Sequence, residues 1–366
     1  MQRVSVGALE AGMTAARNVY SADGLLLVAR NMVLTDAMVA NIENTTLGSI
    51  YIQNPLFPEL EIDDVVTEDN RRRAVMVLKN TVANYQKSSS LDIAPLKRVL
   101  RDLVTEIILH RESMIHHLDT RTLQDYIYAH SVNTCILSVL IAVNMGYSES
   151  KLNDLALGVI LHDIGMMMLP DNLLLKTGSY TPEESKQVQQ HPETGFNILR
   201  TLPEIPTTVA HIAFQHHERV DGKGYPRNLS ADKIIEFAKV AAVADIFDAL
   251  VADRPYRKGM LPHEAYEVMM TLANTYVDQE ILHLFLTHVA IYPLGSVVLL
   301  DNGQHAVVTQ VRQKLQTRPH VRLLTDRQGQ LLREQPEIDM TKHLTLMITR
   351  ILKEKEVFEL GKAVSA

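Results

Sequence analysis

Apolar residues recur at every third or fourth position through most of the middle of the chain. This spacing places them on one face of a helix, and it extends almost without interruption from about residue 120 to 290. Two more amphipathic helices are expected within 68–118, separated by Lys87–Ser90. The pattern predicts a mainly α protein, in which a helical bundle forms the core and small β-rich modules lie at its N-terminal and C-terminal sides.

The same pattern divides the chain into four expected parts. Residues 1–66 are expected to form a small mixed α/β module, and 67–119 a helical connector suited to a homodimer interface. Residues 120–291 are expected to form a helical catalytic domain, and 292–366 a small β-rich module with a terminal helix. Thr35 is the expected N-cap of a helix in the first part. In the last part, Asn302-Gly303 is typical of a hairpin turn, and 344–353 is expected to form the final helix.

Seven polar residues interrupt or end the apolar helices of the third part. They are His130, His162, Asp163, His191, His216, His217 and Asp245. Any one of them, taken alone, is more often a hydrogen-bonded core residue than a ligand. Two buried carboxylates are costly without a cation, however, and a bundle can bring all seven residues together. Five imidazoles and two carboxylates suit two divalent ions with a shared bridging group, such as iron, manganese or zinc.

Two glycines accompany the His162-Asp163 pair. Gly158 is expected to let a neighbouring helix approach closely. Gly165 is expected to supply the left-handed residue that ends its helix. Other histidines, among them His116 and His211, are interpreted as surface or packing residues.

Composition and charge narrow the range of partners. A net charge of −7 disfavours a general DNA- or RNA-binding protein, because such proteins present basic surfaces. The single cysteine, Cys135, can form no internal disulfide, as is usual in a reducing compartment. No apolar run approaches the roughly 20 residues of a membrane span, and no signal-peptide core is apparent. We therefore expect a cytoplasmic protein without membrane insertion.

The ordered motifs between residues 120 and 290 resemble the HD-GYP domain. They are His130-Ser131, His162-Asp163-Ile164-Gly165, His191-Pro192, His216-His217-Glu218 with Asp221-Gly222-Lys223-Gly224-Tyr225-Pro226, and Asp245-Ile246-Phe247-Asp248-Ala249-Leu250 with Arg254-Pro255-Tyr256-Arg257. Members of that family are helical HD phosphohydrolases that hydrolyse the bacterial second messenger cyclic di-GMP. The resemblance implies a phosphodiesterase that opens this dinucleotide to linear pGpG, with a further cut to GMP left open.

The resemblance also implies two divalent ions, with iron or manganese preferred and zinc, nickel or magnesium as alternatives. The seven residues would divide between them, with Asp163 as the bridge: His130, His162, Asp163 and Asp245 for one ion, and His191, His216 and His217 for the other. His162 and Asp163 are the expected catalytic residues, and a hydroxide bridging the ions would attack phosphorus. Tyr126 occupies the position of a Glu found in members with three ions, so two are expected.

Substrate contacts implied by the resemblance lie outside the metal set. They are Asp221, Gly222, Gly224, Tyr225, Pro226, Arg254 and Arg257. The two arginines match phosphate-contacting positions of the family, where a guanidinium can bind phosphate in bidentate fashion, although a helix-end salt bridge is the alternative. The Gly-Tyr-Pro loop is associated in the family with partner recognition, so a signalling-protein partner is a further expectation.

One position departs from the family pattern. The family commonly has Lys after His-Asp-Ile-Gly, and this chain has Met166. Loss of that cation would weaken substrate binding or turnover by roughly 1.5–3 kcal/mol, the contribution of one charged hydrogen bond. For this reason one alternative to an active cyclic di-GMP phosphodiesterase stays open, a slow cyclic di-GMP receptor that signals through its other modules. An HD phosphohydrolase for another nucleotide is a further alternative.

Overall fold

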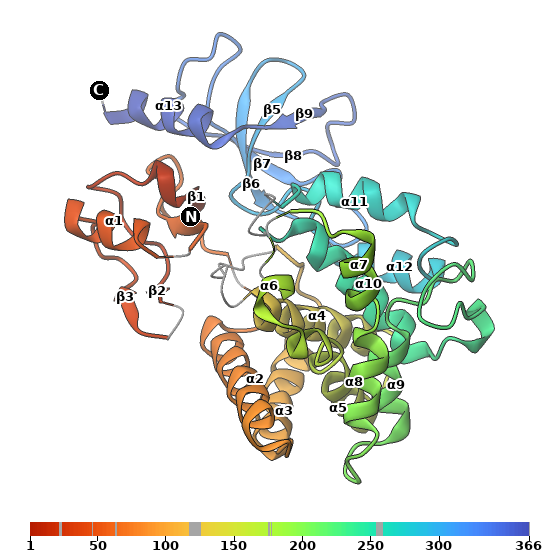
Figure 1. Ribbon diagram of the computed structural model, residues 1–366. Coiled ribbons are helices and arrows are strands. Elements are labelled where there is room, and N and C mark those ends of the chain that lie inside the picture. Colours follow the sequence, from red (N-terminus) through yellow and green to blue (C-terminus); the bar gives the residue numbers. More distant parts are fainter. Residues whose placement is uncertain are drawn as a thin grey trace. The chain divides into compact units, whose positions relative to one another are not determined.

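The computed structural model describes most of the chain and divides into two compact units. The described residues are 1–21, 24–45, 47–62, 64–116, 126–174, 176, 178–253 and 259–365, without the side chains of 362–365. The helical unit comprises Val65–Ser113 and Asp125–Leu286. The terminal unit comprises Met1–Asp64, Met114–Gln124 and Thr287–Ala366. Figure 1 labels most of the helices and strands of both units.

The helical unit contains helices and connecting loops throughout its described residues. Its elements are α2 (Glu68–Ser88), α3 (Ala94–Leu109), α4 (Tyr126–Asn144), α5 (Glu149–Ile160), η2 (Met166–Met168), α6 (Asp171–Leu174), α7 (Pro182–Val188), α8 (His191–Leu199), α9 (Thr207–Gln215), η3 (Ala231–Lys233), α10 (Glu236–Val251), α11 (Pro262–Thr271) and α12 (Gln279–Leu286). The mainly α fold expected from the helical spacing is confirmed.

α4 is the central helix of this unit and packs against α5 and α10. Nearly all of its side chains are buried, including Cys135. By length and composition alone α4 could cross a membrane, so the expectation that no run is long enough was wrong. In the structure, 83% of its most apolar window is buried inside the protein, and a core helix of a helical domain passes the same test.

The terminal unit consists of small sheets and short helices. Its elements are β1 (Gln2–Ser5), η1 (Val6–Ala8), β2 (Val19–Tyr20), β3 (Leu26–Val28), α1 (Asp36–Glu43), β4 (Ser49–Ile52), β5 (Val297–Leu300), β6 (His305–Gln310), β7 (His320–Leu323), β8 (Glu337–Asp339), β9 (Ile348–Ile351) and α13 (Glu354–Ser365). β1 pairs with β4 and β2 with β3, whereas the last strands form one antiparallel sheet in the order β8-β7-β6-β5-β9.

Residues from both sides of the helical unit share one core within the terminal unit. Phe57 is fully buried in a cluster with Val297 and Val357. At the edge of this core, the side-chain oxygens of Glu354 accept hydrogen bonds from Ser5, and Arg322 pairs with Glu59. The first and last of the four expected parts therefore pack as a single unit, although they are far apart in sequence.

Of three local predictions for the terminal unit, the helix cap and the hairpin are confirmed and the last helix was placed wrongly. Thr35 caps α1 as predicted, because its hydroxyl accepts a hydrogen bond from the Met38 N–H. The hairpin around Asn302-Gly303 is also confirmed, with β5 and β6 antiparallel and Gly303 at φ +88°. The helix predicted over 344–353 was wrong. β9 lies there and pairs with β5, and the terminal helix begins only at Glu354.

Candidate metal centre

Five segments of the helical unit bring the seven predicted residues together. His130 lies in the first turns of α4, Asp245 in α10, and His191 at the start of α8, while the others follow the ends of α5 and α9. They form two groups, and within each group one ligand atom per residue lies within 4.8 Å of every other. The groups are His130, His162 and Asp245, and Asp163, His191, His216 and His217. All are buried except His217, which is half-buried.

In the first group, both nitrogens of His130 face carboxylates. Nε2 lies 2.9 Å from Oδ1 of Asp245, and Nδ1 lies 2.6 Å from Oδ2 of Asp248. The ring of His162 is oriented differently, because its Nδ1 lies 2.7 Å from the carbonyl oxygen of Val159 and donates to it. Its Nε2 is buried and has no hydrogen-bond partner among the described residues. The lone pair of this nitrogen therefore points into the group, where no described residue donates a hydrogen bond to it.

In the second group, the backbone orients two imidazoles. Nδ1 of His191 donates to the Val188 carbonyl at 2.7 Å, and Nδ1 of His216 donates to the Ala213 carbonyl at 2.9 Å. With both protons on Nδ1, the two Nε2 atoms, 3.3 Å apart, turn lone pairs toward each other. Oδ1 of Asp163 lies 3.2 Å from one and 3.6 Å from the other.

Asp163 also faces the first group, because its Oδ2 lies 3.4 Å from Nε2 of His162. Its two oxygens are therefore directed at different groups. Metal–ligand bonds to nitrogen and oxygen are about 2.0–2.2 Å, which separates neighbouring ligand atoms by about 3 Å. The observed separations of 2.9–3.6 Å between these donor atoms fit such spacing. The residues present therefore fit divalent metal ions, with one carboxylate shared between two positions.

Charge in the centre is arranged as a cation requires. Burial lowers the pKa of His162 to about 4 and, together with His216, holds the pKa of His217 well below its usual value. Burial alone would raise the pKa of Asp163, but His162, His191 and His216 hold it well below the usual value. An ionised carboxylate beside the neutral imidazoles of His162 and His217 is in the protonation state that binds metal.

His216 and His130 differ from these two imidazoles. Burial works against the charge of both, but Asp163 raises the pKa of His216 above the usual value. Tyr126 and the carboxylates of Asp245 and Asp248 raise the pKa of His130 well above the usual value. The same contact lowers the pKa of Asp245, against the effect of burial. Without a metal the His130 ring is therefore a charged imidazolium with a proton on each nitrogen. An incoming metal ion would displace the proton on Nε2.

Close backbone contacts hold the segments in this arrangement. A Cβ on Gly165 would lie 2.1 Å from the carbonyl oxygen of His191, so the turn after Asp163 and the start of α8 touch directly. The left-handed conformation predicted for Gly165 was wrong, because its φ is −67°. The prediction for Gly158 is confirmed, since a Cβ there would lie 2.3 Å from Cδ1 of Ile212 on α9.

The Gly-Tyr-Pro loop borders the second group. The ring of Tyr225 stacks on His217 at 4.7 Å between centroids. Gly224 has no room for a side chain, because a Cβ would lie 2.3 Å from the backbone nitrogen of Arg219. Buried Glu218 fixes the rest of the loop by accepting hydrogen bonds from the backbone N–H groups of Arg227 and Leu229, at 2.8 and 2.9 Å.

The predicted substrate residues are placed unevenly. Tyr225 is near the metal residues, and Pro226 follows it through a cis peptide bond. Asp221 forms a two-point ion pair with Arg219, and Gly222 takes a positive φ of +73° in the same loop. These contacts show Asp221 shaping the loop. Arg254 and Arg257 lie outside the described residues.

Sequence reasoning missed the part played by Asp248. It noted the residue as buried but assigned it no role. The structure shows its carboxylate 2.6 Å from Nδ1 of His130, where it fixes the orientation of the ring so that Nε2 faces Asp245. The available signal was its spacing of three residues from Asp245, which places both carboxylates on one face of α10.

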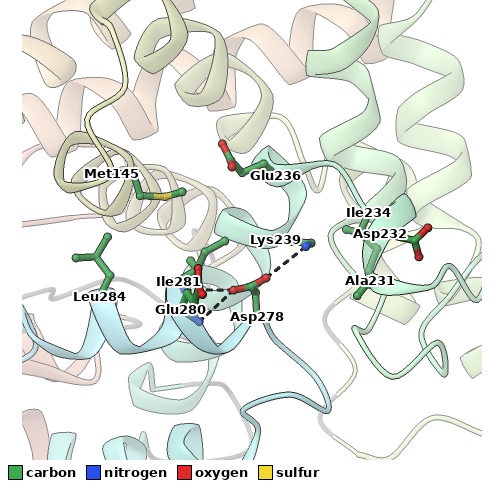
Figure 2. A pocket seen from close by; sticks show the side chains of 10 residues that line it. All are labelled: Met145, Ala231, Asp232, Ile234, Glu236, Lys239, Asp278, Glu280, Ile281 and Leu284. Atoms are coloured by element: carbon green, nitrogen blue, oxygen red, sulfur yellow. Dashed lines mark hydrogen bonds and ion pairs between the residues drawn. The ribbon is translucent and has the colours of Figure 1, made fainter.

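A separate pocket of about 410 Å³ lies beside α10 and α12, and none of the seven residues lines it. Figure 2 shows Lys239 facing Asp278, at 3.3 Å between Nζ and Oδ2. The other oxygen of Asp278 accepts hydrogen bonds from the first backbone N–H groups of α12. The central charges of this pocket are therefore used in holding the two helices.

Two parts of the chain match known protein families. Residues 103–281 match the family model of the HD domain, and residues 297–360 match that of a KOW domain associated with the HD domain. Similar proteins include a cyclic di-GMP phosphodiesterase of Pseudomonas aeruginosa, which is 29% identical over 73% of this chain and 64% of its own length. The helical unit is therefore similar to the HD domain over residues 103–281.

Further similar proteins cover other shares of this chain. A cyclic di-GMP phosphodiesterase of Thermotoga maritima is 34% identical over 64% of each chain, and a 3′3′-cGAMP-specific phosphodiesterase of Vibrio cholerae is 36% identical over 42% of this chain and 34% of its own. A solved structure of an HDG"Y"P protein from Bdellovibrio bacteriovorus aligns over 78% of this chain and 97% of its own, with a TM-score of 0.48 and 19% identity. The chain spans just under two thirds of the first two relatives.

Proposed function

We propose that this protein is a metal-dependent phosphodiesterase of the HD-GYP family that hydrolyses cyclic di-GMP to linear pGpG, with GMP as the product of a second cut. The observation that carries the proposal is the position of Asp163, whose two oxygens face two separate groups of buried donors. The cyclic di-GMP phosphodiesterases among its relatives support the choice of substrate.

The residues of the centre would hold two ions, His130, His162 and Asp245 on one side and His191, His216 and His217 on the other, with Asp163 between them. When bound, such ions supply a nucleophilic hydroxide at neutral pH and neutralise charge that develops on the phosphate. We propose iron or manganese, because the donors are nitrogen and oxygen and the only cysteine is buried in α4 away from both groups.

The side chains around the donors have complementary roles. Asp248 keeps the ring of His130 in place, and the backbone carbonyls at Val159, Val188 and Ala213 do the same for three other rings. Each imidazole thus presents Nε2 without a rotation that would cost energy at binding. Tyr225 covers one face of His217 and would limit access of water from that side.

Met166 favours a second candidate, a slow receptor that binds the dinucleotide. It lies half-buried at the start of η2, three residues after Asp163, and brings no charge to a phosphate. Met166→Lys discriminates between the two candidates. An enzyme limited by this position gains roughly 10- to 100-fold in kcat/KM, the equivalent of about 1.5–3 kcal/mol. If the protein is a receptor, the variant binds more tightly without faster turnover.

The central experiment is turnover by the full chain purified without oxygen and loaded with Fe(II) or Mn(II). Products from cyclic di-GMP and from 3′3′-cGAMP are separated by chromatography, and metal content is counted on the same sample. We expect two ions per chain and faster hydrolysis of cyclic di-GMP. Preference for 3′3′-cGAMP would instead support the third alternative, an HD phosphohydrolase for another nucleotide, which the Vibrio cholerae relative favours.

We extend the proposal to the setting of the protein. A cytoplasmic location fits an intracellular dinucleotide and one buried thiol. α2 and α3 are proposed as a homodimer interface, and the half-exposed loop around Tyr225 as a contact for a signalling partner. Sedimentation of the chain alone tests the first, since a monomer at micromolar concentration would exclude a stable dimer.

A further inference from the structure

Two loops of the terminal unit expose large apolar side chains close together. The loop between β6 and β7 carries Leu315, which is 42% exposed, and the loop between β8 and β9 carries Leu344 and Met347, which are 72% and 50% exposed. Arg318 joins the loops, because its guanidinium donates to the carbonyl oxygen of Leu344 at 3.1 Å and to Sδ of Met347 at 2.9 Å. We call this surface the loop patch.

The two loops of the loop patch also carry four cationic side chains. Arg312, Lys314, Arg318 and Lys342 lie within 311–318 and 340–347, and neither segment contains Asp or Glu. Among the described residues, the carboxylate of Asp339 pairs with the patch, because it is 3.9 Å from Nζ of Lys342, and it is shared with His320. The surplus of positive charge is notable because the whole chain carries −7.

The exposed leucines and methionine of the loop patch, together with its cations, distinguish between two kinds of anionic partner, a nucleic acid and a membrane. Single-stranded nucleic acid is held by stacking on aromatic rings as well as by cations. The two segments contain no Phe, Tyr or Trp. At the boundary of a bilayer, by contrast, apolar side chains enter the acyl region while Lys and Arg contact anionic headgroups.

We propose that the loop patch docks the protein on a membrane surface rich in anionic phospholipid. Leu315, Leu344 and Met347 would enter the headgroup region, and the four cations would lie at its level. Docking of this kind is peripheral and reversible, and it requires no spanning segment. It would hold the terminal unit at the membrane and would be independent of the metal centre.

Sedimentation of the full chain with phospholipid vesicles tests the proposal. We expect binding to vesicles of phosphatidylcholine with phosphatidylglycerol, little binding to phosphatidylcholine alone, and release at high salt. The double variant K314Q/K342Q should weaken partitioning about 25-fold, because each cation near the surface contributes about fivefold. The double variant L344S/M347S should reduce it to the level of uncharged vesicles.

Matched controls come from the helical unit. M270S removes a methionine that is 43% exposed on α11, and K186Q/K233Q removes two exposed lysines, so both should bind as the unchanged protein does. All variants should keep their melting temperature and hydrolysis in solution. Vesicle binding that is absent, or equal in patch and control variants, would overturn the proposal. Loss of self-association or of RNA binding in the patch variants, without any vesicle effect, would also overturn it.

Discussion

The two halves of the metal centre are held in place by different parts of the protein. His130 is fixed by a neighbouring side chain, Asp248, whose carboxylate meets its Nδ1. His191 and His216 are fixed by backbone carbonyls, and the turn at Gly165 lies against the backbone of His191. The ring of His130 in the first half can therefore be adjusted by exchanging one side chain, whereas the position of His191 in the second depends on how closely two backbone segments approach.

Removing the residue common to both halves should have the largest effect. Asp163→Ala deletes the carboxylate whose oxygens lie 3.4 Å from His162 and 3.2 Å from His191. Loss of a shared ligand in a two-metal site costs several kcal/mol, so turnover should fall at least about a thousandfold and both ions should be lost. Metal counting and product chromatography measure this, and unchanged turnover would remove Asp163 from the mechanism.

A change at Gly165 should disrupt the half that depends on the backbone. Gly165→Ala places Cβ 2.1 Å from the His191 carbonyl oxygen, so the two segments must separate. We expect a loss of about 3 kcal/mol in the free energy of unfolding, at the upper end for overpacking, and weaker metal binding. Gly178→Ala is the control, because no atom lies within 4 Å of its Cβ. Equal urea midpoints for the two variants would contradict the close contact.

Asp248→Asn should affect the other half alone. The amide has the same shape but no charge, so it cannot support a positively polarised His130. Affinity for one of the two ions should fall 10- to 100-fold while the other binds as before. Titration with Mn(II), read by calorimetry, separates the two events. Equal weakening of both ions would show that the halves are not held independently.

A buried histidine outside the metal centre should make the stability of the protein depend on pH, with a smaller effect than the substitutions above. Burial lowers the pKa of His116 to about 4, and its Nδ1 accepts a hydrogen bond from the Leu294 N–H at 3.2 Å. Unfolding restores a pKa near 6.5, so the unfolded chain binds the proton first and stability is lost as pH falls from about 6.5 to 4. Between pH 7 and 5 the loss should be about 2 kcal/mol.

His116→Asn tests this prediction, because the amide oxygen can still accept the hydrogen bond but does not titrate. Urea unfolding at pH 7 and pH 5 should show a smaller decrease for the variant than for the unchanged chain. Identical decreases would mean that His116 is protonated in the folded protein. Two histidines of the metal centre, His130 and His216, differ from His116 because carboxylates within reach raise their pKa.

Much of the metal centre was accessible from the sequence because each of its residues breaks an apolar helical pattern. His130 and Asp245 stand among buried apolar residues of α4 and α10, where a polar side chain needs a reason. The structure brings all seven such residues into two groups. Sequence spacing alone could not tell Asp245 from Asp248, since both lie on one face of α10 and only the tertiary fold decides which one faces the interior of the site.

Errors arose where contacts distant in sequence override local preference. Residues 348–351 form a strand because β5 offers an open edge, although the local pattern resembled a helix. Gly165 was correctly singled out but for the wrong reason, because its neighbour at His191 is 26 positions away. The joining of 1–64 with 287–366 had no local signal at all.

That joining has a consequence for the order of events at the ribosome. Phe57 is synthesised long before Val297 and Val357, the residues that enclose it. Until they emerge, its apolar surface stays exposed, while the intervening helices can already assemble from contacts closer in sequence. A nascent chain halted before residue 297 should therefore engage chaperones through its earliest segment, even though the helices that carry the candidate metal ligands are already folded.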